Sequence, residues 1–360
     1  MFNQFRKNET RLHQLSYLFW ECTRRCNMKC LHCGSDCSPD CSSTVNKMED
    51  LPFDDFLEAI LPLKEAYKPN SITVAITGGE PLMRKDLPEC GRRLRQHGFL
   101  WGIVTNGYDY TPDMHGRLLG AGMSSLSLSL DGLEATHNWL RGNGQSFQRA
   151  VNALALITST KHLTYDVITC VNQKNVYELE EIKEFLIAHH VRAWRLFTIA
   201  PIGRAARNDA LRLSPEQLKY LLDFIVNSRS RNTILVTFSC ESWVGAYEKK
   251  VRDEYFFCRA GINIASVLID GSICACPNIN RSFVQGNIYR DSFLDVWNKR
   301  FEIMRDRRWT KTGLCKDCKD YRNCSGGPMH LWNEKKDTIL TCIHQAVTGG
   351  PGAGFSKSSF

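Results

Sequence analysis

Three cysteines near the N-terminus have the spacing Cys-x3-Cys-x2-Cys, as Cys26, Cys30 and Cys33. Thiolates this close in sequence can share one soft metal centre, which would be an iron–sulfur cluster, zinc or copper(I). A structural zinc site needs four protein ligands, and this loop offers only part of that set. A cubane cluster held by three cysteines leaves one iron open to bind a substrate. The spacing therefore favours an iron–sulfur cluster that takes part in a reaction.

Two structural interpretations compete with this one. Cysteines at such intervals also occur as small buried residues on a helix or within a disulfide framework. With 16 cysteines in 360 residues, the chain is too long for a small disulfide-stapled protein. It shows no secretory signal, because the apolar stretch 15–20 is too short, and no apolar run reaches the roughly 18 residues of a membrane span. We therefore expect a cytoplasmic protein without membrane contact, in which clustered cysteines serve metal or redox chemistry.

The overall composition is that of a globular protein with room for more than one domain. Hydrophobic residues make up 43% of the chain and charged residues 23%, so a large core can be buried. The net charge of +8 comes from basic residues scattered along the sequence. Because they form no basic stripe interleaved with aromatic residues, we expect no nucleic-acid partner.

Strand and helix patterns alternate through the N-terminal part of the chain. Apolar and β-branched runs predict strands at 15–21, 71–77, 101–105, 124–130, 164–171 and 193–199. Apolar residues at helical spacing predict intervening helices, among them 147–158 and 176–189. Six such repeats predict an α/β fold with a parallel sheet, open or closed into a partial barrel. In such folds the reacting groups lie at the carboxyl ends of the strands.

Distinctive short segments follow these predicted strands. The turn Gly78-Gly79-Glu80-Pro81 lets the backbone approach a ligand closely and offers one carboxylate beside it. Thr105-Asn106-Gly107 ends the next strand, and Ser127 to Gly132 ends the one after. Taken singly, the glycine turn is a common turn, and its place at a strand end behind the cysteine loop gives it weight.

The cysteine loop and these segments, in this order, resemble the radical S-adenosylmethionine (SAM) enzymes over about residues 15–205. The resemblance implies a partial (β/α)6 TIM-like barrel in which Cys26, Cys30 and Cys33 hold a [4Fe–4S] cluster. It also implies that SAM is bound by residues after the strands, which here are Gly78, Gly79, Glu80, Asn106, Ser129, Asp131 and Arg141. In this scheme the segment Gly78-Gly79-Glu80-Pro81 borders the methionine amino group, and Arg141 pairs with the carboxylate of SAM. The alternative for Arg141 is a surface arginine at the start of a helix.

The remaining cysteines are concentrated in the C-terminal third, and six of them form a pattern: Cys258, Cys276, Cys315, Cys318, Cys324 and Cys342. The spacing of the last four alone also fits a zinc ribbon. Behind a radical SAM core, the pattern resembles the SPASM extension, a small cysteine-rich α+β domain with auxiliary iron–sulfur clusters. The resemblance implies that the last four cysteines hold one auxiliary cluster, and that Cys258 and Cys276 belong to another. Residues 263–269 and 272–276 predict a hairpin between these two cysteines.

The second auxiliary cluster lacks an expected ligand. The family pattern has a cysteine four residues after Cys324, where this chain has Pro328. The cluster is then incomplete or absent, unless a substitute ligand comes from Cys274, Cys240 or His330. Cys274 and Cys276 would share one face of a strand and could both face a metal, although Cys274 could equally fill the core. We predict two well-formed [4Fe–4S] clusters and a third site that is unusual or partly occupied.

The sequence also predicts how the chain is divided. We expect a radical SAM core at 1–235, a SPASM-like domain at 236–345 and a flexible Gly/Ser-rich tail at 346–360. Cys37 and Cys41 are expected to be spare thiols in a loop, the alternative being a place in the active site. Cys90 and Cys170 are expected in the core.

The leading hypothesis is a radical SAM/SPASM oxidoreductase or maturase. By resemblance, it cleaves SAM reductively to a 5′-deoxyadenosyl radical and modifies a peptide or protein substrate, with flavodoxin or ferredoxin as reductant. Alternatives with the same chemistry are dehydrogenation of a small molecule and sulfatase-type maturation. A non-catalytic metal-binding scaffold is the alternative of another class, and it has no need of segments that bind SAM. The sequence does not indicate the catalytic acid or base.

Overall fold

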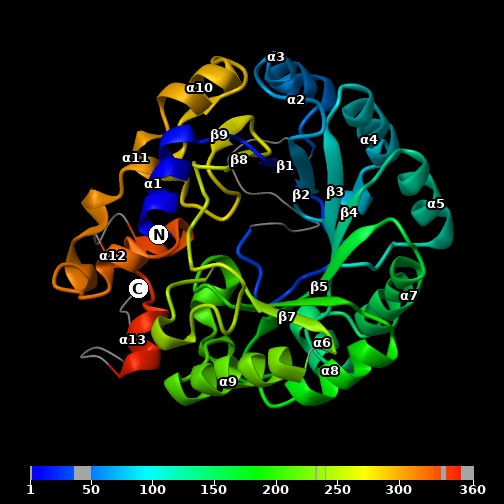
Figure 1. The fold of residues 1–360 in the computed structure, drawn as a ribbon. Coiled ribbons are helices and arrows are strands. Elements are labelled where there is room, and N and C mark those ends of the chain that lie inside the picture. Colours follow the sequence, from blue (N-terminus) through cyan, green and yellow to red (C-terminus); the bar gives the residue numbers. More distant parts are fainter. Residues whose placement is uncertain (1, 36–49, 232, 240, 334–337, 350–360) are drawn as a thin grey trace.

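A curved ten-stranded sheet is the main element of the computed structural model, which describes residues 2–35, 50–231, 233–239, 241–333 and 338–349 (Figure 1). The strand order is β10-β9-β8-β1-β2-β3-β4-β5-β6-β7. The strands are β1 (Tyr17–Glu21), β2 (Thr73–Thr77), β3 (Leu100–Thr105), β4 (Ser125–Ser129), β5 (Thr164–Val171), β6 (Ala193–Thr198), β7 (Leu235–Phe238), β8 (Ile264–Val267), β9 (Ser272–Cys274) and β10 (Gly286–Asn287). The run from β8 to β7 is parallel, and β9 and β10 extend it antiparallel. The predicted parallel sheet, curved into a partial barrel, is confirmed.

Helices cover the outer face of this sheet (Figure 1). They are α2 (Phe53–Ile60), α3 (Leu63–Ala66), α4 (Leu87–Gln96), α5 (Pro112–Gly120), α6 (Glu134–Arg141), α7 (Ser146–Thr158), α8 (Leu179–Ala188) and α9 (Pro215–Arg231). Local sequence sets several of their ends. The Thr111 side chain caps α5 by accepting a hydrogen bond from the Met114 N–H, and Gly142 ends α6 in the left-handed conformation, with φ of 67°.

The two faces of the barrel strands differ in polarity. Along β5, buried residues alternate with half-buried ones, and the buried face packs against helices. The other face carries Asp166, which forms an ion pair with Arg195 of β6 at 2.8 Å and accepts a hydrogen bond from Ser127 of β4 at 2.6 Å. Burial raises the pKa of Tyr17 on β1, and the charges of Arg195 and Asp166 also act on this pKa. Because β1 lies far from β5 and β6 in the strand order, these groups face one another across a polar barrel interior.

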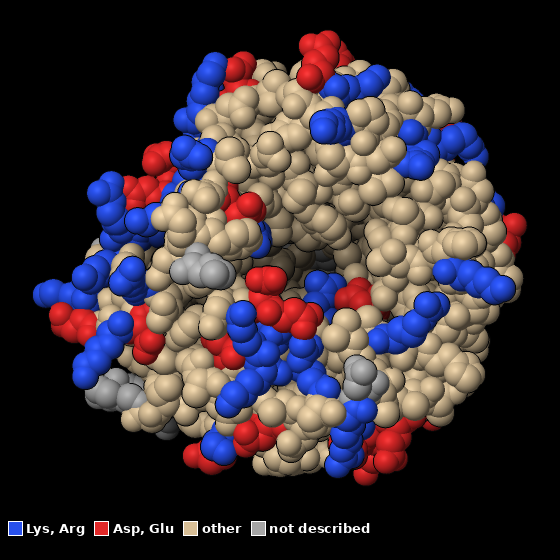
Figure 2. Space-filling view, viewed as in Figure 1, with Lys and Arg blue, Asp and Glu red and all other residues tan. Residues whose placement is uncertain are grey.

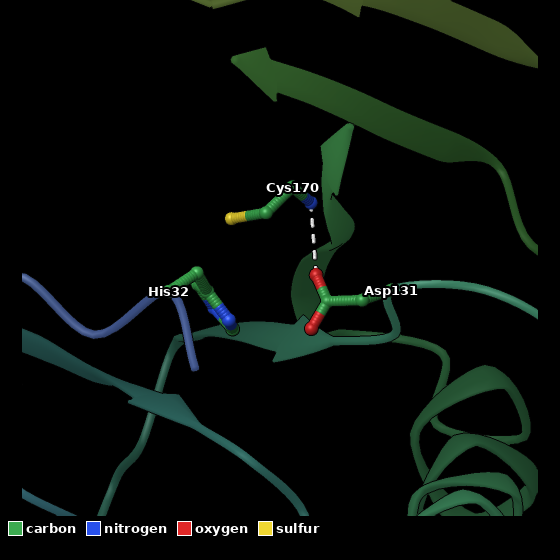
Figure 3. Close-up of side chains that lie close together, drawn as sticks. All are labelled: His32, Asp131 and Cys170. Carbon is green, nitrogen blue, oxygen red and sulfur yellow. Dashed lines mark hydrogen bonds between the residues drawn. The ribbon is translucent and has the colours of Figure 1, made fainter. Parts of the chain in front are cut away.

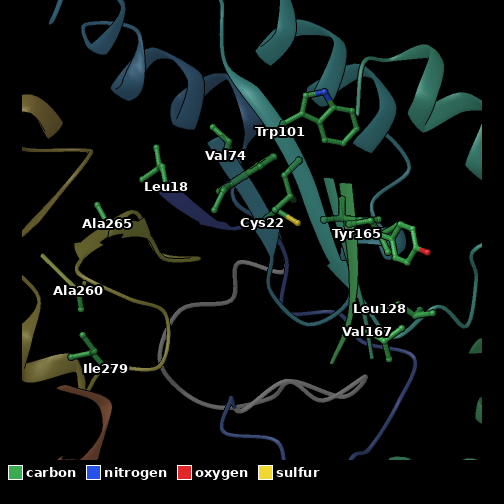
Figure 4. Packing of buried hydrophobic residues seen from close by; sticks show 14 of the residues in the cluster. Leu18, Cys22, Val74, Trp101, Leu128, Tyr165, Val167, Ala260, Ala265 and Ile279 are labelled. Atoms are coloured by element: carbon green, nitrogen blue, oxygen red, sulfur yellow. The ribbon is translucent and has the colours of Figure 1, made fainter. Parts of the chain in front are cut away.

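The hydrophobic core lies between the strands and the surrounding helices (Figure 4). Leu18, Val74, Trp101 and Leu128 are almost fully buried on successive strands. The same cluster includes Ala265 on β8, so the core continues from the barrel into the C-terminal third.

Strand β8 joins the C-terminal third to the first strand of the barrel. Residues 17–20 of β1 pair with 264–267 of β8 in parallel register, and the predicted hairpin is formed by β8 and β9. Strand β7 spans the predicted domain boundary at 235/236, so the sheet continues across it. The N-terminal helix α1 (Phe2–Leu12) also reaches this third, since Arg6 donates hydrogen bonds to the carbonyl groups of Arg322 and Asn323.

The C-terminal third is built of short elements. They are the helices α10 (Phe293–Lys299), α11 (Glu302–Arg305), α12 (Tyr321–Cys324) and α13 (Ile343–Thr348), with a small sheet of β11 (Trp332–Asn333) and β12 (Thr338–Ile339). Among the described residues of the whole chain, no helix combines the length and apolar character needed to cross a membrane.

Candidate active site

The loop with the first three cysteines follows the carboxyl end of β1. Burial, together with the charges of nearby Glu80, Cys30 and Cys33, raises the pKa of the Cys26 thiol to about 12. The three thiols therefore lie close enough to act on one another electrostatically. Thiols with raised pKa values lose their protons when they bind a metal, so this donor set fits one shared metal centre.

The glycine turn after β2 is hydrogen-bonded to the backbone of the chain that leads into this loop. The N–H of Gly79 donates to the carbonyl oxygen of Thr23 at 2.7 Å, and the N–H of Glu80 donates to that of Arg25 at 2.8 Å. A Cβ atom on Gly78 would lie 2.4 Å from the Thr23 oxygen, and one on Gly79 would lie 2.2 Å from the Arg25 oxygen. The close approach that the glycines permit is thus to the backbone that leads into Cys26.

The carboxylate of Glu80 organises the ends of β2 and β3. It accepts hydrogen bonds from the Thr105 hydroxyl at 2.7 Å, the Asn106 N–H at 2.8 Å and the Leu82 N–H at 3.2 Å. Burial raises the pKa of Glu80 to about 7, and these donors counteract part of that rise. The Asn106 side chain donates in turn to the Asn27 side chain at 2.8 Å, which links the β3 end to the cysteine loop.

Arg141 and Asp131 form a buried ion pair beside the cysteine loop. Arg141 Nε donates to Asp131 Oδ2 at 2.6 Å, and Arg141 Nη1 lies 3.8 Å from the Cys30 sulfur. Burial alone would raise the pKa of Asp131, but the Arg141 charge outweighs it and holds this pKa below its usual range. Arg141 stands in the last turn of α6 and is 7% exposed, so the alternative of a surface arginine at a helix start is wrong.

His32, Asp131 and Cys170 point toward one another (Figure 3). One ligand atom from each lies within 4.8 Å of the others, and the Cys170 N–H donates to Asp131 Oδ1 at 2.8 Å. Burial lowers the pKa of His32 to about 4, so the ring is neutral. Its Nδ1 is buried without a hydrogen-bond partner among the described residues, which fits a site where a bound molecule supplies one.

Two parts of this site were not identified from the sequence. Cys170 was expected in the core, but it lies on the polar face of β5, and the alternation along β5 is the signal that could have placed it there. The 3-10 helix Gly203–Arg207 closes the cysteine loop, because Arg204 donates through its N–H to the Cys33 carbonyl at 3.0 Å and through Nε to the Cys30 carbonyl at 2.8 Å. No motif marked this helix.

On the face shown in Figure 2, acidic and basic side chains gather around a hollow near the centre. In the matching view of Figure 1, this hollow lies inside the ring of strands. A reaction site at the carboxyl ends of the strands would therefore be lined by charged groups as well as thiols.

Four cysteines of the C-terminal third form a second group of thiols. Burial, together with the charges of nearby Cys342 and Cys318, raises the pKa of Cys315 to about 11. Burial likewise raises the pKa of Cys324 to about 12, and Cys342 and Cys315 add to the effect. The structure thus brings together the four cysteines that were predicted to hold one auxiliary cluster, and this donor set fits such a cluster.

The described residues around Cys258 place hydrogen-bond donors beside its thiol and supply no ligand in place of the missing cysteine. Burial would raise the pKa of this thiol, but the Arg307 guanidinium and the N–H groups of Met329 and Ala260 hold it below its usual value. Arg307 also donates to the Gly327 carbonyl at 3.0 Å, so it occupies the space next to Pro328, where the family pattern has a ligand. These donors favour the thiolate form of Cys258, but they cannot themselves replace the missing ligand at Pro328.

Of the proposed substitute ligands, two lie among the described residues, and Cys274 takes the core position that was its alternative. Cys274 is fully buried in the core cluster, with its sulfur 3.9 Å from the Phe283 carbonyl oxygen. Burial lowers the pKa of the other one, His330, to about 4, and a neutral imidazole is the form that can bind a metal. Cys240 lies outside the described residues, as do Cys37 and Cys41.

Fold and site together define a class: a parallel partial barrel whose first strand leads into a three-thiol metal loop, followed by a segment with a separate four-thiol site. Two family models match the chain, that of the Radical SAM superfamily at residues 20–186 and that of an iron-sulfur cluster-binding domain, SPASM, at 258–319. The chain is a radical SAM enzyme with a C-terminal SPASM domain. Its cofactors are accordingly SAM, a [4Fe–4S] cluster in the radical SAM domain, and auxiliary iron–sulfur clusters in the SPASM domain.

Relatives with assigned functions cover most of the chain. Mycofactocin maturase MftC of Mycolicibacterium smegmatis is 29% identical over 87% of this chain and 77% of its own length. AdoMet-dependent heme synthase of Methanosarcina barkeri is 25% identical over 85% of this chain and 89% of its own length.

Solved structures share the fold. Streptococcus suis SuiB bound to its precursor peptide SuiA has a TM-score of 0.71 at 15% identity, over 95% of this chain and 79% of SuiB. The structure of anSMEcpe with bound AdoMet has a TM-score of 0.70 at 18% identity, over 93% of this chain and 91% of that one.

Proposed function

We propose that this enzyme modifies a peptide or protein substrate by radical SAM chemistry. One observation supports this chemistry most directly. Cys26, Cys30 and Cys33 lie together at the carboxyl ends of the barrel strands, on a loop held by backbone hydrogen bonds from the glycine turn. The peptide substrate is supported by the similarity to mycofactocin maturase and by the shared fold with SuiB, whose structure contains a precursor peptide. We further propose a cytoplasmic location and flavodoxin or ferredoxin as the reductant.

The proposed roles follow the contacts of each side chain. Cys26, Cys30 and Cys33 hold the [4Fe–4S] cluster, which, when bound, supplies the electron that cleaves SAM. Arg141 lies beside Cys30 and, together with Asp131, shapes the polar side of the SAM site. SAM contacts are proposed for Gly78, Gly79, Glu80, Asn106 and Ser129, with Glu80 also acting as the organiser of two strand ends.

Anaerobic reconstitution with iron, sulfide and SAM tests the first part of this proposal. Under dithionite we expect 5′-deoxyadenosine from the wild type and none above background from a variant with alanine at Cys26, Cys30 and Cys33. The variant Cys315→Ala should still form 5′-deoxyadenosine but no modified product. Equal loss of both activities in Cys315→Ala would show that this thiol is needed for folding. The substrate to test first is any short peptide encoded beside the gene.

A tetrapyrrole is the second candidate substrate. It is favoured by the heme synthase of Methanosarcina barkeri, which this chain matches over more of the relative's length than it does mycofactocin maturase. Titration of the protein with Fe-coproporphyrin III, followed by the Soret absorption band, separates the two. Saturable binding and turnover of the porphyrin would replace the peptide proposal, whereas no binding together with modification of the peptide would confirm it.

A further inference from the structure

A cavity lies between the carboxyl ends of the barrel strands and the four-thiol site of Cys315, Cys318, Cys324 and Cys342. Thr198, the last residue of β6, and Glu241, which follows β7, lie on its barrel side. Thr341 and Ile343 lie on its other side, and these two residues flank Cys342. The cavity therefore extends from the carboxyl ends of the strands to the loop that carries an auxiliary-cluster ligand.

Glu241 is a buried carboxylate at this cavity. It is 4% exposed, and Thr198 Oγ1 donates a hydrogen bond to its Oε2 at 2.9 Å. Burial raises the pKa of Glu241 to about 7, while the Thr198 hydrogen bond and the Arg252 charge counteract part of the rise. Arg212 also lines the cavity, so two cationic side chains belong to the surroundings of this carboxylate.

Glu241 also lies close enough to Cys170, on the polar face of β5, to act on it electrostatically. Its charge is one of the causes, after burial and Asp131, that raise the pKa of the Cys170 thiol. Cys170 donates its N–H to Asp131, and the partner of Asp131 is Arg141, which lies beside Cys30. Glu241 thus stands between the thiols that hold the first cluster and those that hold the auxiliary cluster.

We propose that Glu241 is the catalytic residue that takes up the substrate proton in this reaction. The inference rests on the proposed radical SAM function. A substrate C–H bond breaks and its hydrogen atom goes to the 5′-deoxyadenosyl radical, which becomes 5′-deoxyadenosine. The auxiliary cluster, when bound, would take up one electron from the carbon radical, and the atom that forms the new bond to this carbon would lose one proton to the Glu241 carboxylate. Both hydrogens and both electrons that leave the substrate are then accounted for.

Other buried carboxylates are already engaged in holding the backbone. The oxygens of Glu248 accept hydrogen bonds from the N–H groups of Val244 and Phe256, both at 2.9 Å. Glu80 likewise holds two N–H groups and a hydroxyl. Glu241 instead accepts from a side-chain hydroxyl, that of Thr198, and both residues line the cavity.

The matched pair of variants is Glu241→Gln and Glu248→Gln. Both remove a buried carboxylate that interacts with Arg252, but only Glu241 lines the cavity. The first readout, on anaerobically reconstituted holoenzyme, is the midpoint potential of the auxiliary cluster between pH 5.5 and pH 8.5, by dithionite titration and electron paramagnetic resonance. We expect the potential to fall with rising pH in the wild type and in Glu248→Gln, and to be independent of pH in Glu241→Gln. A potential that is flat in the wild type, or that falls equally in Glu241→Gln, would overturn the proposal.

The second readout requires no cofactor chemistry. A carboxyl group whose pKa is raised in the folded state gives stability that is present below about pH 4.5 and is lost as pH rises through about 7. The unfolding midpoint in urea should therefore fall less with pH in Glu241→Gln than in the wild type. Formation of 5′-deoxyadenosine by the wild type tests the proposed function separately. Its absence from the wild type would refute the proposed function, whereas its presence with unchanged pH dependence would refute only the role of Glu241.

Discussion

Replacing either partner of the Arg141–Asp131 pair should destabilise the fold strongly. The two side chains are 9% and 1% exposed, and their charged atoms lie 2.6 Å apart. At an effective dielectric constant of about 20, opposite charges about 4 Å apart attract by about 4 kcal/mol. Removing one partner leaves the other charge buried and unpaired, at a typical cost of about 3–5 kcal/mol. We therefore expect Asp131→Asn and Arg141→Met each to lower the free energy of unfolding by about this amount.

A double-mutant cycle measures the interaction itself. Asp131→Asn is the appropriate variant because asparagine keeps an oxygen that can accept the Cys170 N–H. Urea unfolding followed by tryptophan fluorescence should show that the double variant loses less stability than the two single variants together, by about 3 kcal/mol. Asp166→Asn is the control, because its ion pair with Arg195 has exposed fractions of 22% and 39% and should contribute less than about 1 kcal/mol. Additive effects at Asp131 and Arg141 would refute the argument.

Three further predictions follow from the site. Gly79→Ala should displace the cysteine loop and lower bound iron in anaerobically purified protein, since its Cβ would lie 2.2 Å from the Arg25 carbonyl oxygen, whereas Gly116→Ala, whose Cβ meets nothing within 4 Å, should keep the wild-type iron content. In the wild type we expect the free energy of unfolding to fall by roughly 3 kcal/mol as pH rises from about 4.5 to about 7, because Glu80 loses its proton. Glu80→Gln should abolish this fall. An unchanged pH profile in urea unfolding of the variant would contradict this. Cys258→Ser should leave iron unchanged at about eight atoms per chain, and about twelve in the wild type would show a third cluster.

The strands were largely predictable from the sequence because their signals are local. The alternating run at 164–171 gave both ends of β5, and the glycine and asparagine turns marked where β2 and β3 end. The pairing of β8 with β1 had no such signal. Two short parallel strands almost 250 residues apart carry no local mark of their partnership, because the connection between them is the whole barrel.

The site was predictable where a motif specifies chemistry and not where topology creates it. The cysteine spacing identified the metal loop, and it also identified the four thiols of the C-terminal third. Cys170 and Glu241 belong to no motif, and they meet the site only because β5 and β7 end at the same edge of the sheet. For Arg141 the resemblance implied a contact with SAM, but its ion pair with Asp131 could be seen only in the folded chain.

The position of β1 between β2 and β8 has a consequence for biosynthesis. A ribosome that adds about 5–20 residues per second needs roughly 10–50 seconds to proceed from β1 to β8. Throughout that interval the strand that leads into Cys26 has one unpaired edge, and unpaired edges invite association with other chains. A fragment that ends at residue 235 would keep this edge permanently. The growing chain is therefore exposed to edge-to-edge association at β1 until residues 264–267 emerge.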